Sequence, residues 1–310
     1  MTHSPVHRDD TRAISLRAFA KINLALDLVG LRADGYTEIA TVFQSVDLHD
    51  EIKLSVHPQP GPTEISVTEA ELGPAEQNLC WRAVEVLRTR KKFTNRVTVE
   101  LRKQIPIGGG LGGGSSDAAT VLWGLSALIG ASDPAVSIEC ARLLGADVPY
   151  FLELGTVLGT GRGDDLEVWP DLPRLPVVLA ALGPPLATAD VFQRARGALT
   201  TLDQPPKISR LWRHLQEASP GLPPVWNDLT ISAVQLRPEI DRLLGHFAAL
   251  GGVAAMSGSG CVVFGLFESE PDAQAAAVEL QRNEPAAWVR QAWTLPRQAA
   301  RAQRRAPLHE

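Results

Sequence analysis

The sequence contains a glycine-rich stretch, PIGGGLGGGSS, at positions 106–116. Because glycine has no Cβ, successive backbone N–H groups of such a stretch can converge on one anion. We expect a helix to begin directly after it with Ser115 as N-cap, and the N-terminus of a helix adds unpaired N–H groups and a positive dipole end. A strand, a glycine loop and a helix in this order predict a phosphate-binding site. A flexible linker would have no reason to lie between an amphipathic strand and a capped helix.

Two common nucleotide-binding motifs do not explain this stretch. The P-loop pattern GxxxxGK[ST] requires a lysine at the end of the loop, where Ser115 stands instead. Gly108, Gly110 and Gly113 satisfy the GxGxxG pattern of dinucleotide-binding dehydrogenases, but that pattern alone is weak. The acidic residue expected about 20 residues further on falls at Asp133, which opens a helix instead of ending a strand. The P-loop class is therefore excluded, and the dehydrogenase class is disfavoured.

The elements before the loop predict a mixture of sheet and helix. Residues 21–28, KINLALDL, alternate between apolar side chains on one face and Lys21 and Asn23 on the other. This alternation predicts a half-buried strand. Further strands are expected at 52–56, 65–67 and 97–101, with a helix at 79–87 between the last two.

Two helices are predicted after the loop. The first ends near Gly130, which is typical of a helix C-terminus. The second has Asp133 as its cap and Pro134 in its first turn, and it ends near Gly145. Asp147 follows directly and is therefore expected in a loop.

Prolines become frequent from about Trp169 onward, which indicates a domain junction. We expect an N-terminal domain at 14–168 and a C-terminal domain at 169–296, with tails at 1–13 and 297–310. The arginine-rich C-terminal tail is expected to be a solvated end. The element order of the second domain predicts a ferredoxin-like α+β layer. Its expected elements are a strand at 177–182, a helix from 188, a helix at 238–250, a strand, the SGSG turn at 257–260, a strand, a helix and a strand near 288–295.

Charge and cysteine content exclude several classes of protein. A formal net charge of -5 argues against a nucleic-acid binder, whose phosphate contacts require a basic surface. The three cysteines, Cys80, Cys140 and Cys261, lack the spacing of a metal site and are expected to be reduced core thiols. We find neither the apolar stretch of a signal peptide nor an apolar run of membrane-spanning length. These observations predict a cytoplasmic protein that binds neither nucleic acid nor membrane.

Three ordered blocks of the sequence resemble the GHMP small-molecule kinases. They are AKINL at 20–24 with RADGY at 32–36, the glycine loop with LGADVP at 144–149, and SGSGC at 257–261; NDL at 227–229 is a weaker fourth. The resemblance spans roughly residues 18 to 268, and such a spread is more specific than any single motif. It implies an α+β fold with a ribosomal-protein-S5-like N-terminal domain and a ferredoxin-like C-terminal domain. It also implies ATP-dependent phosphorylation of a small alcohol.

The resemblance assigns catalytic roles to two residues. Asp147 would be the base that accepts the proton of the attacking hydroxyl, and Lys21 would neutralise charge on the transferring phosphoryl group. Without the resemblance, Asp147 could instead cap local N–H groups and Lys21 could be a solvated strand residue. Magnesium is expected from the chemistry, with Ser116 as a candidate ligand. ATP would be held by Pro106, Ile107, Gly108, Gly109, Gly110, Leu111, Gly112, Gly113, Gly114, Ser115 and Ser116.

Within the family, the blocks are most similar to kinases of the non-mevalonate isoprenoid route. These phosphorylate the 2-hydroxyl of an alcohol that carries a cytidine diphosphate. Tyr36 and Phe192 would stack on the two faces of the cytosine ring, although Phe192 could equally be a core residue. Thr37 stands where these kinases usually have a histidine beside the pyrimidine.

Other substrate contacts and other functions stay open. Asn23 could contact the substrate or form a cross-strand hydrogen bond, and Gly258 and Gly260 could line the cleft or belong to a simple hairpin turn. Alternative functions are a GHMP kinase acting on homoserine or a mevalonate-type alcohol, a binding protein with the same fold, and a dehydrogenase. A monomer or weak homodimer is expected.

Overall fold

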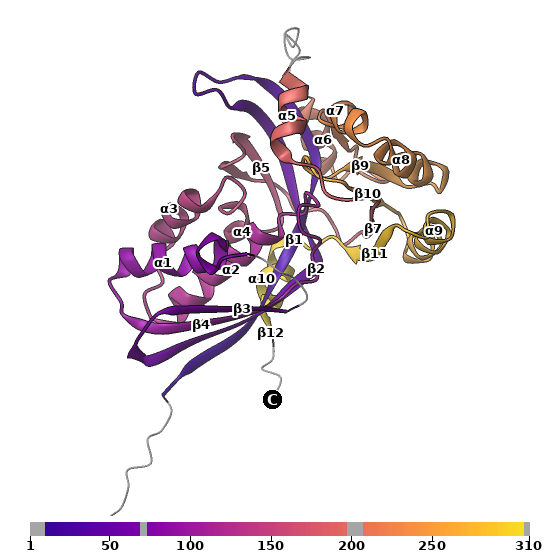
Figure 1. Cartoon of the computed structure of the whole chain (residues 1–310). Coiled ribbons are helices and arrows are strands. Elements are labelled where there is room, and N and C mark those ends of the chain that lie inside the picture. The colour runs from indigo at the N-terminus through magenta and orange to yellow at the C-terminus, as the bar shows by residue number, and fades with distance from the viewer. Residues whose placement is uncertain (1–9, 69–72, 197–206, 307–310) are drawn as a thin grey trace, which may run out of the picture.

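The computed structural model of the chain describes residues 10–68, 73–196 and 207–306, and its strands form two separate sheets (Figure 1). The larger sheet has eight strands, with β12, β1, β2, β4 and β3 in this order, β5 and β6 attached to β2, and β8 attached to β1. Its strands are β1 (Arg12–Leu31), β2 (Thr37–Pro60), β3 (Thr63–Thr68), β4 (Asn95–Arg102), β5 (Thr156–Gly161), β6 (Asp165–Val168), β8 (Trp226–Asn227) and β12 (Arg305–Ala306).

The long antiparallel hairpin of β1 and β2 runs through the middle of the molecule (Figure 1). Helices of the N-terminal half cover its lower part, while Ile22 and Leu24 share a core cluster with Val177 and Phe264 of the second sheet. The central part of β1 is therefore buried on both faces, and Lys21 is only 3% exposed. The expectation of a half-buried strand is wrong, because the second sheet covers the apolar face while the glycine loop and the SGSG turn cover the polar face of Lys21 and Asn23.

The helices of the N-terminal half follow the predicted order. They are α1 (Leu79–Lys91), α2 (Gly113–Leu128), α3 (Pro134–Leu144) and the short α4 (Tyr150–Glu153), with a 3-10 turn at Ala75–Gln77. Asp133 caps α3 as predicted, since its side chain accepts hydrogen bonds from Ala135 N and Val136 N. Ser115 does not cap α2: the N-cap is Gly112 with φ +71°, and the Gly112 carbonyl accepts the first helical hydrogen bond from Ser116 N.

The smaller sheet confirms the ferredoxin-like layer. Its four strands are antiparallel in the order β11, β7, β10 and β9, with helices inserted after β7 and after β10. Helices α6 (Ile208–Gln216) and α7 (Thr230–Leu236) were not expected from the sequence. The elements are β7 (Pro176–Ala181), α5 (Thr188–Arg196), α6 (Ile208–Gln216), α7 (Thr230–Leu236), α8 (Glu239–Ala249), β9 (Val253–Met256), β10 (Val262–Leu266), α9 (Glu270–Asn283) and β11 (Trp288–Trp293).

The C-terminal segment is not a solvated tail. Residues Arg297–Gln303 form helix α10, and β12 pairs with β1 at the lower end of the larger sheet (Figure 1). Arg304 between them is 3% exposed. The prediction failed because the arginine content suggested solvent contact, whereas several of these arginines bond to the N-terminal domain. The division of the chain at position 169 stays a prediction.

Two predictions about the chain as a whole can be compared with the structure. Cys80, Cys140 and Cys261 are all buried and free of disulfides, as expected. Within the described ranges, no helix has the length and apolar character needed to cross a membrane.

Candidate active site

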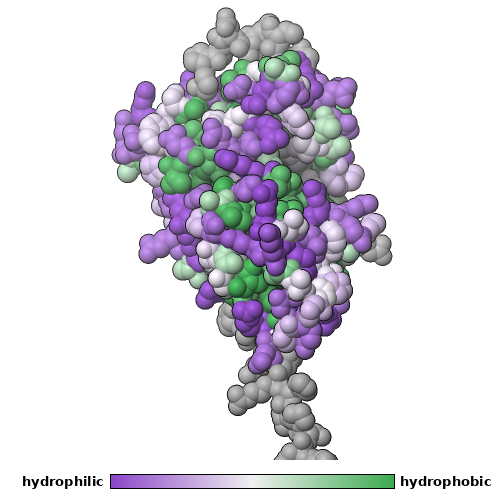
Figure 2. All heavy atoms as spheres, turned by 90° about the vertical axis from the view of Figure 1, so that its left-hand side faces the viewer, coloured by the Kyte–Doolittle hydropathy of each residue, from purple (hydrophilic) through white to green (hydrophobic). Residues whose placement is uncertain are grey.

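A cavity of about 1240 Å³ opens between the glycine loop, the β1–β2 hairpin and helix α5. It brings together most of the residues that the sequence singled out, from segments far apart in the chain. Those lining it are Lys21, Asn23, Tyr36, Thr37, Pro106, Ile107, Gly108, Gly109, Gly110, Gly112, Gly113, Gly114, Ser115, Asp147, Phe192 and Gly258. Figure 2 shows the face of the molecule on the left of Figure 1, where apolar side chains gather in several patches among polar ones.

Three predicted residues lie behind the cavity wall. Leu111 is fully buried, and its carbonyl accepts a hydrogen bond of 3.0 Å from Lys21 N. The Ser116 hydroxyl donates a 2.6 Å hydrogen bond to the carbonyl of Phe19, so it faces strand β1 rather than the cavity. Gly260 packs against the backbone of the glycine loop. Ser116 is therefore not placed as a magnesium ligand.

The glycine loop and the SGSG turn pack backbone against backbone. A Cβ on Gly110, whose φ is +83°, would lie 2.1 Å from the carbonyl oxygen of Ser257, and one on Gly260 would lie 2.2 Å from Gly109 C. Ser257 Oγ donates to the Gly110 carbonyl at 3.0 Å, and Val262 N donates to the Gly109 carbonyl at 3.2 Å. Both turns need glycine for this contact, and each fixes the other.

Lys21 and Asp147 meet in the cavity. Lys21 Nζ lies 4.0 Å from Asp147 Oδ2, and the Asp147 side chain is 38% exposed whereas that of Lys21 is 3% exposed. The ammonium group also donates a 2.5 Å hydrogen bond to Asn23 Oδ1 and lies 5.6 Å from the centre of the Phe43 ring. Burial lowers the pKa of Lys21, and the Asp147 carboxylate opposes that shift. The site thus holds a fixed cation beside an accessible carboxylate.

Asn23 forms the cross-strand hydrogen bond that the sequence left open. Its Nδ2 donates to Thr41 Oγ1 on β2 at 2.7 Å, and Thr41 Oγ1 donates in turn to the Ala25 carbonyl at 2.8 Å. Because Asn23 Oδ1 accepts from Lys21, the amide links the lysine to the hairpin. Asn23 therefore orients Lys21 and also lines the cavity.

The aromatic residues lie at the outer part of the cavity. Tyr36 is 57% exposed, and the guanidinium of Arg162 lies 5.8 Å from the centre of its ring. Phe192 on α5 is partly buried and packs against the core cluster of the C-terminal domain, while it also lines the cavity. Thr37 is buried, and its Oγ1 accepts a hydrogen bond of 3.4 Å from Arg196 Nε. An exposed tyrosine is available for a ligand in a way that a core tyrosine is not.

Sequence reasoning missed a buried charged cluster beside the glycine loop. Lys103 Nζ donates to Asp117 Oδ2 at 2.7 Å and also to Asp50 Oδ2, and Asp50 Oδ1 accepts from the backbone N–H groups of Gln104 and Ile105. Lys103 and Asp117 line the cavity. Burial raises the pKa of Asp117 to about 8, although Lys103 opposes that shift. The available signal was that Lys103 lies three residues before the start of the loop at Pro106.

Among the described residues, no group of three or more His, Cys, Asp or Glu side chains could hold a metal ion. The carboxylates at the cavity are those of Asp147 and Asp117. Magnesium needs no such cage in phosphoryl-transfer sites, where one or two carboxylates, substrate phosphates and waters complete its coordination. Asp147 fits a metal site of that kind.

The fold and the site define a small-molecule kinase. Residues 78–154 match the family described as "GHMP kinases N terminal domain", and residues 212–286 match "GHMP kinases C terminal". A homoserine kinase from Cytophaga hutchinsonii has the same fold, with a TM-score of 0.70 at 17% identity over 97% of this chain and 99% of that one. The chain belongs to the GHMP kinases.

More similar relatives share one name. A 4-diphosphocytidyl-2-C-methyl-D-erythritol kinase from Citrifermentans bemidjiense is 39% identical over 87% of this chain and 95% of its own. The crystal structure of a 4-(cytidine 5'-diphospho)-2C-methyl-D-erythritol kinase matches with a TM-score of 0.75 at 33% identity, covering 91% of this chain and 100% of that one. Within the GHMP kinases, the chain therefore belongs with the 4-diphosphocytidyl-2-C-methyl-D-erythritol kinases.

Proposed function

We propose that the protein transfers the γ-phosphoryl group of ATP to the 2-hydroxyl of 4-diphosphocytidyl-2-C-methyl-D-erythritol, in the non-mevalonate route to isopentenyl diphosphate. The observation that carries the proposal is the pair of Lys21 and Asp147, 4.0 Å apart in the cavity that the glycine loop lines. The names of the relatives support the choice of acceptor.

Each half of the site has a separate task. The glycine loop and the N-terminus of α2 supply converging N–H groups for the phosphates of ATP. Asp147 accepts the proton of the attacking hydroxyl, and Lys21 stabilises negative charge on the transferring phosphoryl group. When bound, magnesium would neutralise charge on the phosphates, and Asp147 is the residue that would help to hold it. Positioning and electrostatics supply most of the acceleration, because the transition state needs little covalent help from the protein.

The outer part of the cavity would hold the cytidine group. Tyr36 and Phe192 would grip the cytosine ring through its faces, as flat bases are commonly bound. Thr37 stands where these kinases usually have a histidine, so it offers no imidazole to the base. The edge of the base would instead form hydrogen bonds with the backbone of Thr37 and with Arg196, which already donates to the Thr37 hydroxyl. Gly258 of the SGSG turn lines the cavity and leaves room for the acceptor alcohol.

The proposal includes a cytoplasmic enzyme that acts as a monomer or weak homodimer and binds neither nucleic acid nor membrane. The formal net charge of -5 supports the last two points, since nucleic acids and anionic lipid surfaces both attract basic proteins.

The test is ADP release with ATP and magnesium, measured separately with 4-diphosphocytidyl-2-C-methyl-D-erythritol, homoserine and mevalonate. Turnover with the cytidine compound alone supports the proposal and shows that Thr37 is compatible with it. Turnover with homoserine or mevalonate instead would move the protein to another GHMP specificity. ATP binding without turnover on any acceptor would indicate a binding protein.

A further inference from the structure

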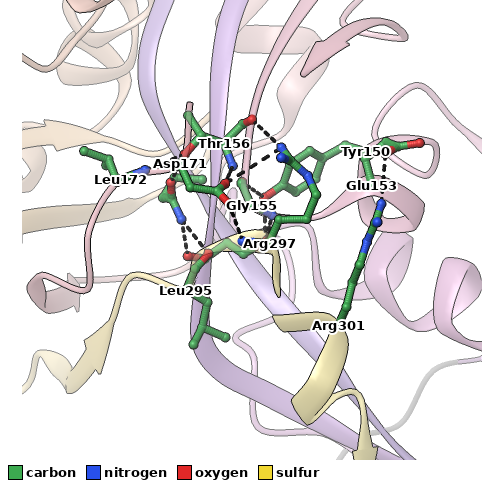
Figure 3. Close-up of polar contacts among 11 residues, drawn as sticks. Tyr150, Glu153, Gly155, Thr156, Asp171, Leu172, Leu295, Arg297 and Arg301 are labelled. Carbon is green, nitrogen blue, oxygen red and sulfur yellow. Dashed lines mark hydrogen bonds and ion pairs between the residues drawn. The ribbon is translucent and has the colours of Figure 1, made fainter. Parts of the chain in front are cut away.

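The C-terminal segment, residues 297–304, contacts helix α4, which directly follows the catalytic loop, residues 145–149 with Asp147. Helix α4 begins three residues after Asp147, and the segment bonds to it at two points. Arg301 Nη2 pairs with Glu153 Oε2 at 3.1 Å, and Arg304 Nη2 donates to the carbonyl oxygen of Phe151. Figure 3 shows Arg301 reaching α4 beside the polar network around Arg297.

The opposite side of α4 faces the reacting groups. A Cβ on Gly112 would lie 2.6 Å from Phe151 Cζ and 3.3 Å from Lys21 Cγ, so the Phe151 ring, the glycine loop and the lysine stem are in contact. Tyr150 packs on Phe43, the ring below the Lys21 ammonium. Helix α4 therefore lies between the active site and the C-terminal segment and contacts both.

The start of the C-terminal segment is fixed by a separate network. Arg297 N donates to Asp171 Oδ2 at 2.8 Å, and Arg297 Nη2 donates to the Thr156 carbonyl at 2.8 Å (Figure 3). Thr156 N donates to Asp171 Oδ1 at 2.9 Å. At its other end the Arg304 carbonyl accepts a 2.8 Å hydrogen bond from Arg17 N on β1. Both ends of the segment are thus attached to strands of the larger sheet, β5 and β1.

Burial of the Arg304 guanidinium costs desolvation free energy. Arg304 is 3% exposed, none of the ion pairs among the described residues includes it, and burial lowers its pKa to about 10. Its compensation is the Phe151 carbonyl and the ring of Trp123, whose centre lies 5.3 Å from the guanidinium carbon. The last carbonyls of a helix lack donors within the helix, and Arg304 supplies one to α4. A buried charge without a counter-ion lowers stability, which suggests that Arg304 is retained for a role other than stability.

We propose that the C-terminal segment positions the catalytic loop, and that Arg304 is the positioning residue. This inference rests on the proposed role of Asp147. When Arg304 holds the Phe151 carbonyl, the Phe151 ring stays packed against Gly112, and α4 keeps Asp147 near Lys21. Without that bond α4 can move away, and a displacement of about 1 Å can lower the rate by about a hundredfold.

The first experiment compares kcat and KM for Arg304→Met, Arg304→Lys and Arg305→Met. Arg305 is the matched control, because its guanidinium lies 5.5 Å from the same Trp123 ring and it is exposed. We expect Arg304→Met to lower kcat by about tenfold or more with little change in KM for ATP, Arg304→Lys to recover part of it, and Arg305→Met to leave kcat unchanged. Equal effects of Arg304→Met and Arg305→Met on kcat would overturn the inference.

A double-mutant cycle separates positioning from a general loss of structure. If Arg304 acts through Asp147, Arg304→Met should lower kcat much less in an Asp147→Asn background than in the wild type. If Arg304→Met lowers kcat by the same factor in both backgrounds, while Asp147→Asn is itself impaired, the inference about Arg304 is overturned and the role of Asp147 stands. Wild-type kcat in Asp147→Asn would instead overturn the proposed role of Asp147. If Arg304→Met does not fold, the cycle is made with Arg304→Lys.

Discussion

Asp147 and Lys21 divide the work of phosphoryl transfer between an accessible carboxylate and a buried cation. The exposed carboxylate can meet an incoming hydroxyl, whereas the lysine is held by Asn23 and Phe43 in one orientation. Burial lowers the pKa of Lys21, so its positive charge depends on the Asp147 carboxylate more than that of a surface lysine would. The two residues should therefore respond differently to substitution and to pH.

Replacing Asp147 with asparagine should preserve shape and ATP affinity but remove the base. Loss of general-base catalysis typically costs about 10²–10⁴-fold in rate, and we expect kcat to fall within that range. Steady-state kinetics combined with an ATP-binding isotherm measure both quantities. An undiminished kcat would exclude Asp147 as the base.

Lys21 should set an alkaline limit to activity. Because burial lowers its pKa, the ammonium group loses its proton at a lower pH than an ordinary lysine. We expect kcat to decline on the alkaline side with an apparent pKa below that of free lysine, and Lys21→Ala to lower kcat by about 10²–10³-fold. A substitution that changed only KM would make Lys21 a binding residue.

Tyr36 should affect the acceptor and not the nucleotide donor. Stacking of a base on an aromatic ring contributes about 1–3 kcal/mol, so Tyr36→Ala should raise KM for the cytidine substrate roughly tenfold or more. KM for ATP should stay the same. Equal increases in both KM values would show that Tyr36 stabilises the fold instead.

At the scale of elements, the two glycine turns form one structural unit. The backbone conformation of Gly110 would strain any other residue, and a Cβ there would collide with Ser257. Gly114 lies in helix α2, where the nearest atom to an added Cβ, Leu79 Cδ1, is 3.7 Å away. The pair offers a matched comparison of the same substitution at two glycines of the stretch 106–116.

Gly110→Ala should abolish ATP binding and destabilise the protein, because a left-handed alanine costs roughly 1–2 kcal/mol before the collision is counted. Gly114→Ala should instead stabilise the helix by about 0.5–1 kcal/mol. Urea unfolding and ATP titration of both variants give the comparison. Similar behaviour of the two variants would refute the packing described for the turns.

The cluster of Asp50, Lys103 and Asp117 ties β2 and β4 to α2. The pKa of Asp117 is raised from 3.8 to about 8, so the native state holds a proton that the unfolded chain releases. Stability should therefore fall as pH rises from about 4 to about 8. Asp117→Asn should remove this part of the fall, whereas Asp50→Asn should destabilise at every pH because two backbone N–H groups lose their charged acceptor. Unfolding in urea at pH 5 and pH 8.5 tests both. A pH dependence unchanged in Asp117→Asn would contradict this account.

At the scale of the whole molecule, the sequence predicted what local patterns determine. The glycine loop, the Asp133 cap and the order of the ferredoxin-like layer each depend on neighbouring residues, and they were found. The contacts of Lys103 and Arg304 join segments tens to hundreds of positions apart, and nothing local indicates them. The burial of the polar face of β1 was missed for the same reason, since the glycine loop and the SGSG turn that cover it come much later in the chain.

The identity of the phosphorylated product tests the assigned function most directly. The direct measurement is ³¹P NMR of the products formed from ATP and 4-diphosphocytidyl-2-C-methyl-D-erythritol. We predict a new phosphomonoester signal coupled to the methylerythritol carbon skeleton at the 2-hydroxyl, with ADP formed in equal amount, and a signal that grows about 10²–10⁴-fold more slowly with Asp147→Asn. Formation of ADP and free phosphate alone, or phosphorylation at another position, would contradict it.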